Sequence, residues 1–156
     1  MKKIGLILMI CATLFLTACG KEKVQNVEGT LEEIMTKVYS DLPEENRPMM
    51  LGNTEVNAEN IEYYLGSAEI EYEEAIASES GVGSIAHSVV LVRTKENADI
   101  ESIESKIKET INPRKWVCVG VEEKDVIVEN KGNLIILILI EDEQTRETIR
   151  KGFNNL

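Results

Sequence analysis

The sequence has few of the residues on which many enzymes and nucleic-acid-binding proteins depend. It contains one histidine and three cysteines, and its aromatic content is only 4%. The 17 basic residues are outnumbered by 28 acidic ones, which gives a formal net charge of -11. Nucleic acids are bound through clustered Lys and Arg and, when single-stranded, through aromatic stacking platforms. The composition therefore argues against a nucleic-acid partner.

The length and the apolar content set the scale of the fold. With 156 residues, of which 43% are hydrophobic, the chain is long enough for one domain with its own core and too apolar for wholesale disorder. It is too short for an α/β barrel or a two-lobed solute receptor.

Residues 1–18 have the pattern of a secretory signal peptide. Lys2 and Lys3 are followed by an apolar run from 4 to 16, which is shorter than the roughly 20 residues of a membrane span. The run ends in Leu16-Thr17-Ala18-Cys19, which resembles the lipobox of bacterial lipoproteins at all four positions. The alternatives are an ordinary secretory signal with a chance cysteine and an uncleaved signal anchor.

The lipobox resemblance implies that Cys19 receives a diacylglyceryl group and becomes the first mature residue. Two acyl chains anchor a protein stably, whereas one holds it only marginally. We therefore expect a lipoprotein tethered to the extracytoplasmic face of the cell membrane. Cleavage before Cys19 removes two lysines and no acid, so the charge changes from -11 to -13. Anionic headgroups repel such a chain, which favours a body held away from the membrane.

The mature chain divides into a lipidated cysteine with a polar tether, 19–29, and one domain, 30–156. Because Cys19 carries the lipid, Cys118 has no partner for a disulfide, and the domain depends on its hydrophobic core. Thr30 and Glu33 form a capping box that begins a helix, which we expect to continue to Pro43. Further helices are expected at 57–65, capped by Asn57, and after the capping residues Asp99 and Asp142.

Apolar runs between turn residues predict strands at 73–79, 84–93, 116–121, 126–129 and 134–140. The last strand reads LIILILI, and residues that are apolar on both faces indicate a central strand covered on both sides. Segment 44–56 contains Pro48 and Gly52 and is expected to be irregular. Hairpins next to helices, without regular βαβ alternation, predict an α+β fold: an antiparallel sheet of four to five strands with helices packed on it, in a single domain.

Several segments resemble a family of small uncharacterised lipoproteins from Gram-positive bacteria (Firmicutes) that carry a domain of unknown function. The segments are GTLEEIM at 29–35, AHSVVLVR at 86–93, INPRKWVCV at 111–119, and GNL at 132–134 with the apolar strand after it. The resemblance covers most of residues 29–156. It implies an exported, lipid-anchored α+β module and assigns neither an activity nor a catalytic residue.

His87 and Cys118 are the candidates for catalysis. A Ser–His–Asp arrangement would place His87 beside a nucleophile such as Ser84, Ser88 or Cys118, but neither a nucleophile elbow nor a cysteine-protease motif is present. We expect His87 to face water or the sheet edge. Cys118 is expected to be a small buried hydrophobe, with a reactive thiol beside Arg114 and Lys115 as the alternative.

Acidic clusters at 69–79 and 122–125 suggest a cation site, but they match no calcium-binding loop, and one histidine with one cysteine cannot make a structural zinc site. A solvated acidic surface explains these clusters better. We therefore expect neither a metal nor a cofactor.

Two segments have the composition of an interaction surface. Met49 and Met50 lie in an irregular segment, where they either plug the edge of the core or offer an adaptable contact to a partner. Arg114 and Lys115 precede Trp116, the only tryptophan, and Arg and Trp dominate interface hot spots. The alternative for this second segment is a strand start, with the indole in the core and the cations at its rim.

Together these features predict a membrane-anchored lipoprotein that serves as a non-catalytic accessory or binding module of the cell envelope. Its partners would be the membrane, through the lipid, and an unknown envelope protein or small ligand. The alternatives are a small envelope enzyme that uses His87 or Cys118, and a lipoprotein that binds a small ligand or peptide.

Overall fold

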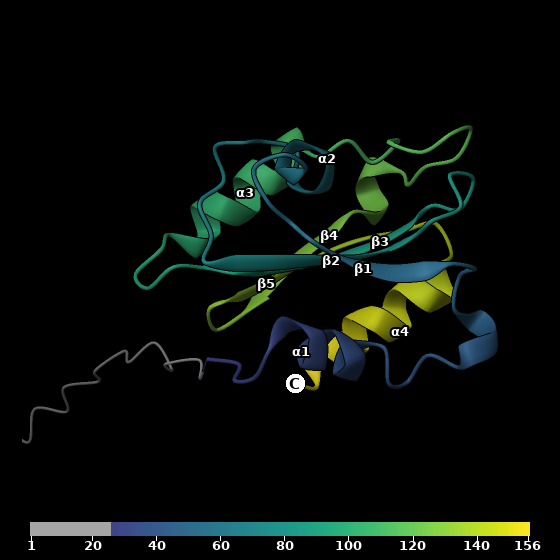
Figure 1. Cartoon of the computed structure of the whole chain (residues 1–156), viewed down its shortest axis with the longest axis horizontal. Coiled ribbons are helices and arrows are strands. Elements are labelled where there is room, and N and C mark those ends of the chain that lie inside the picture. Colours follow the sequence, from purple (N-terminus) through teal and green to yellow (C-terminus); the bar gives the residue numbers. More distant parts are fainter. Residues whose placement is uncertain (1–25) are drawn as a thin grey trace, which may run out of the picture.

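Five strands form one antiparallel sheet in the order β1-β2-β3-β5-β4, with helices on both faces (Figure 1). This computed structural model describes residues 26–156; the expected signal peptide, Cys19 and most of the tether lie outside the described residues. The strands are β1 (Leu51–Glu55), β2 (Glu74–Ser80), β3 (His87–Arg93), β4 (Ile127–Lys131) and β5 (Leu134–Ile140). The helices are α1 (Leu31–Val38), α2 (Ile61–Leu65), α3 (Ile100–Thr110) and α4 (Glu143–Asn154), with 3-10 turns η1 (Glu44–Asn46) and η2 (Glu123–Asp125). The predicted α+β class is confirmed.

The sheet separates two apolar layers, because successive side chains of a strand point to opposite faces. In β3, Val89 and Leu91 pack with α1 and α4, whereas Val90 and Val92 pack with α2 and α3. All seven residues of β5 are buried. The LIILILI segment is therefore a central strand covered on both sides, as predicted, with β3 and β4 as its neighbours.

The predicted helix starts are confirmed at three of the four helices. Thr30 and Glu33 form the reciprocal capping box of α1. The side chains of Asp99 and Asp142 accept hydrogen bonds from Ser102 N–H and Thr145 N–H. For α2 the predicted start is wrong, since Asn57 does not cap it and the helix begins after Asn60, whereas its predicted end at Leu65 is confirmed. The first helix also ends at Val38, earlier than the Pro43 signal predicted.

Segment 51–55 was expected to be irregular, but it forms the edge strand β1. Its sequence, LGNTE, has no apolar alternation, since only Leu51 is partly buried. Backbone pairing with β2 defines this strand, with Leu51 opposite Ser80 and Glu55 opposite Ile76. A strand that depends on a partner's hydrogen bonds rather than on side-chain burial has little signature in its own sequence.

The predicted strand at 116–121 is wrong, because this segment is a loop. Cys118 has a left-handed backbone with φ of 63°, which a strand residue does not adopt. The N–H of Val121 donates to the carbonyl of Pro113, and the N–H of Val117 donates to that of Gly83. These bonds close the loop on itself and on the turn between β2 and β3. Among residues 26–156, no helix is long and apolar enough to span a membrane.

Candidate interaction surface and tether attachment

Three loops meet at one end of the sheet and expose apolar side chains there. Met49 and Met50 are each 72% exposed, and Val117 is 69% exposed. The cations Arg47 and Arg114 lie in the same loops and are also exposed. We call the set Arg47, Met49, Met50, Arg114 and Val117 the tip surface. Exposed apolar side chains that gather in one region mark interaction sites more often than isolated ones do.

Backbone hydrogen bonds hold the three loops side by side. The N–H of Gly81 donates to the carbonyl of Met50 at 3.0 Å, and the Ser80 hydroxyl donates to the carbonyl of Met49 at 2.8 Å. The bond from Val117 N–H to the carbonyl of Gly83, at 2.9 Å, attaches the third loop. The β2–β3 turn therefore bridges the two segments that the sequence nominated separately.

Beneath the tip surface, Lys115 is enclosed by a carboxylate, a hydroxyl and three aromatic rings. Its Nζ lies 2.5 Å from Glu79 Oε2 and 3.2 Å from Ser88 Oγ. Its distances to the ring centroids of Tyr63, Tyr64 and Trp116 are 4.1, 4.8 and 5.1 Å, within the range of cation–π attraction. We call this group of six residues the Lys115 cage.

Burial dominates the electrostatics of the cage. The Lys115 side chain is only 3% exposed, and this burial lowers its pKa, against the opposing effect of the Glu79 carboxylate. The Tyr63 hydroxyl donates to Glu79 Oε1 at 2.6 Å. Burial first, and then this carboxylate, raise the pKa of Tyr63. Each oxygen of the Glu79 carboxylate thus accepts a hydrogen bond, one from Lys115 and the other from Tyr63.

The structure divides the predicted interaction residues into two groups. Met49, Met50 and Arg114 are exposed, as contact residues require. Trp116 is 8% exposed and its Nε1 atom is buried without a hydrogen-bond partner. The indole thus lies in the core, while Lys115 is buried as well, not at the rim. Lys115 and Trp116 support the surface from beneath and do not form part of it.

The expectations for His87 and Cys118 are both wrong, because His87 is buried and Cys118 is exposed. His87 is 3% exposed, and its Nε2 lies 2.8 Å from the hydroxyl of Tyr39. Burial lowers the pKa of His87 to about 4. Its side chain is on the α1/α4 side of β3, whereas its neighbour Ser88 points to the other side, into the Lys115 cage. His87 therefore cannot act as a base toward Ser88. Cys118 is exposed, not buried.

The acidic clusters are paired mainly with lysines. Glu69, Glu71 and Glu122 form ion pairs with Lys106, Lys95 and Lys124 at 2.7, 3.2 and 2.9 Å. Within residues 26–156, no three His, Cys, Asp or Glu side chains lie close enough together to hold a metal ion.

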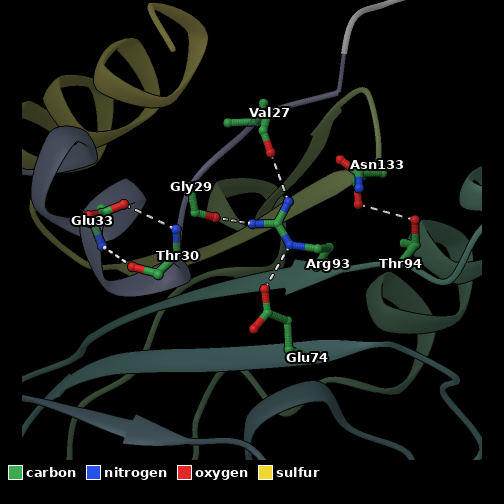
Figure 2. Close-up of polar contacts among 8 residues, drawn as sticks. All are labelled: Val27, Gly29, Thr30, Glu33, Glu74, Arg93, Thr94 and Asn133. Atoms are coloured by element: carbon green, nitrogen blue, oxygen red, sulfur yellow. Dashed lines mark hydrogen bonds and ion pairs between the residues drawn. The ribbon is translucent and has the colours of Figure 1, made fainter.

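At the other end of the sheet, Arg93 attaches residues 26–29, the described part of the expected tether, to the domain (Figure 2). Its guanidinium donates to the carbonyls of Val27 and Gly29 at 2.8 and 2.7 Å, and to the Glu74 carboxylate at 2.7 Å. Gly29 turns the chain into α1 with φ of 108°, a conformation that favours glycine. The capping box of Thr30 and Glu33 follows directly.

Residues 26–29, where the expected tether meets the domain, and the tip surface lie at opposite ends of the sheet (Figure 1). Arg93 is the last residue of β3, while His87, the first, is next to the β2–β3 turn. A strand of seven residues spans roughly 20 Å. Segment 26–30 lies at the left of Figure 1, and the loops of the tip surface lie at the right.

Sequence reasoning missed two of these features, the Arg93 attachment and the Lys115–Glu79 pair. Arg93 and Lys115 were visible only as cations beside apolar runs, and their partners lie 64 to 66 and 36 positions away. No local pattern predicts contacts at such separations. Glu79 carried one weak signal, as a charge in a strand segment between the small residues Ser78 and Ser80.

Comparisons with known proteins add no relative: no family model matches the chain, and no curated protein or solved structure matches it either.

Proposed function

We propose that this protein is a lipid-anchored module on the extracytoplasmic face of a bacterial membrane, where it binds another component of the cell envelope without catalysing a reaction. The observation that carries the proposal is that the tether and the exposed apolar side chains lie at opposite ends of the domain. The tether joins at the Arg93 end of the sheet, and the exposed apolar side chains lie at the opposite end. A module anchored at one end presents its other end away from the membrane.

The lipid anchor in this proposal rests on the Leu16-Thr17-Ala18-Cys19 lipobox and on the basic and apolar segments before it. Support for binding comes from Met49, Met50 and Val117. Exposed apolar side chains in neighbouring loops lower the solubility of a protein unless a partner covers them.

The placement of His87 supports a non-catalytic role. This histidine is buried, hydrogen-bonded to Tyr39, and separated by the sheet from Ser88. A general base needs to reach the proton that it removes. The exposed Cys118 is the remaining nucleophile of the rival enzyme hypothesis.

The anchor is tested by replacing cysteines one at a time in cells fed a clickable fatty acid. Cys19→Ser should abolish acyl labelling and release the protein from the membrane fraction, since serine lacks the acceptor thiol. Cys118→Ser, which removes a thiol from the exposed loop, is the matched control and should keep both properties. Acyl labelling that survives in Cys19→Ser would overturn the anchor. A cellular phenotype lost in Cys118→Ala, with the fold intact, would favour the enzyme.

A further inference from the structure

The segments that carry the tip surface share a second property: they contain no acidic residue. Asp and Glu account for 28 of the 156 residues, yet none occurs in 47–54, 80–92 or 111–121. Acidic residues border these segments at Glu45, Glu55, Glu79 and Glu122. Glu79, which lies beneath the tip surface, is paired with Lys115. The exposed charges within these three segments are the cations Arg47 and Arg114.

The tip surface is also held in one arrangement. Lys115 and Trp116 fix the loop that carries Arg114 and Val117 to the sheet through the Lys115 cage. The Arg47 guanidinium donates to the carbonyl of Tyr39 at 3.3 Å, which restrains the loop before Met49. A surface that is already ordered loses less conformational entropy when it binds.

We infer that the tip surface docks a protein whose contacting face is apolar at its centre and acidic at its rim. Met49, Met50 and Val117 would cover the apolar centre, and methionine adapts its shape to an irregular partner. Arg47 and Arg114 would pair with carboxylates at the rim, since arginine binds carboxylates in a bidentate fork.

Charge steers such a partner to this end of the molecule. The chain carries a net charge of -11, so an acidic protein is repelled by most of its surface. The tip surface, whose own charged residues are Arg47 and Arg114, is the exception, and complementary charge there raises the association rate and selects the orientation. This inference rests on the proposed function for one point, namely that the tip faces away from the membrane to which the protein is anchored.

A protein partner fits these observations better than a lipid surface or an anionic wall polymer. A polyphosphate chain offers no apolar surface to cover Met49, Met50 and Val117. A lipid surface would have to be other than the anchoring membrane, because the tether joins at the far end of the sheet.

The test is site-specific photocrosslinking of the full-length protein in the cells that produce it, with a benzophenone amino acid in place of Val117. Glu101, exposed on α3, is the matched control position. We expect a protease-sensitive adduct from position 117 that is absent from position 101. Mass mapping should place the crosslinked residue of the partner beside Asp or Glu.

Charge reversal decides whether the adduct depends on the tip. Arg47→Glu/Arg114→Glu should lower its yield about tenfold, as expected for the loss of rim charge pairs. Lys108→Glu/Lys151→Glu makes the same change in net charge at exposed positions on α3 and α4, and should leave the yield unchanged. Circular dichroism and thermal melting check that each variant is folded.

Several outcomes would overturn the inference. These are an adduct that survives the Arg47/Arg114 reversal, an equal loss in the lysine control, a protease-resistant adduct of lipid or polymer, or an adduct of twice the mass of the chain, which indicates a second copy. Tip-dependent sedimentation with vesicles of equimolar phosphatidylglycerol and phosphatidylcholine would assign the surface to lipid instead. The Cys19→Ser variant distinguishes failure of the anchor from failure of the docking inference. Its release from the membrane is measured separately, and its tip surface can be crosslinked in the same way.

Discussion

The ammonium of Lys115 lies 2.5 Å from the carboxylate of Glu79, although the two residues are 36 positions apart and both side chains are largely buried. The pair connects an irregular loop to the second strand of the sheet. Since Val117 and Arg114 belong to that loop, the pair determines where two residues of the tip surface lie.

Removing Lys115 should destabilise the domain strongly. Lys115→Met leaves the Glu79 carboxylate buried without its cation, which typically costs about 3–5 kcal/mol. The double variant Lys115→Met/Glu79→Gln should recover part of the loss, because it removes the unpaired charge. Denaturant unfolding measures both, and Lys124→Met, from the exposed pair with Glu122, is the control that should change little. Equal losses in Lys115→Met and Lys124→Met would contradict the role of the pair.

Arg93 should control the mobility of the tether where it joins the domain. Arg93→Met removes the donors to the carbonyls of Val27 and Gly29, so cleavage by a glutamate-specific protease after Glu28 should become faster. Arg150→Met, which breaks ion pairs of α4 with Glu129 and Glu147, is the control for loss of an arginine. Cleavage rates that do not differ between the two variants would show that Arg93 does not hold the tether.

Gly152 should be intolerant of alanine even though it lies within a helix. Alanine normally stabilises a helix interior relative to glycine by about 1 kcal/mol. A Cβ at position 152, however, would lie 2.3 Å from the carbonyl oxygen of Val38, where α1 and α4 approach each other. We expect Gly152→Ala to lower the free energy of unfolding by roughly 1–3 kcal/mol through this overlap.

The matched control for Gly152 is Gly52→Ala in the edge strand. No atom lies within 4 Å of a Cβ built at Gly52, so this variant should be neutral or slightly stabilising. Thermal unfolding of the two variants gives the comparison. A stabilised Gly152→Ala would mean that α1 and α4 can separate at no cost.

His87 should make the domain less stable in acid. Burial lowers its folded pKa from 6.5 to about 4, so between these values the unfolded chain binds more protons than the folded one. Stability from this residue is therefore complete above pH 6.5 and decreases as the pH falls to 4, by on the order of 3 kcal/mol. Carboxylates add their own acid dependence, so the measured quantity is the difference between the protein and His87→Gln.

As the pH falls from 7 to 4, we expect His87→Gln to become more stable relative to the protein that carries His87. A difference that stays constant over this range would show that His87 titrates normally in the folded state. Ser88→Ala is not a suitable control, because that hydroxyl contacts Lys115.

The parts of the fold that the sequence predicted are those with local signals. The caps at Thr30, Asp99 and Asp142 bond to N–H groups within three residues, so the capping side chain and the group that it binds lie in the same short segment. The LIILILI strand is apolar at every position, and only a strand covered on both faces buries all of it. Strand β1 and the loop at 116–121 were misjudged because hydrogen bonds from distant segments define them.

For the candidate site, the sequence alone determined which residues were suited to an interaction surface: two adjacent methionines, and an Arg-Lys-Trp segment after a proline. Tertiary structure decided which of them face water. The β2–β3 turn brings Met50 and Val117 into one surface, and the Glu79 carboxylate and three aromatic rings draw Lys115 inward. Composition and local pattern depend on the residues themselves, whereas exposure depends on contacts between segments that the chain brings together only when it folds.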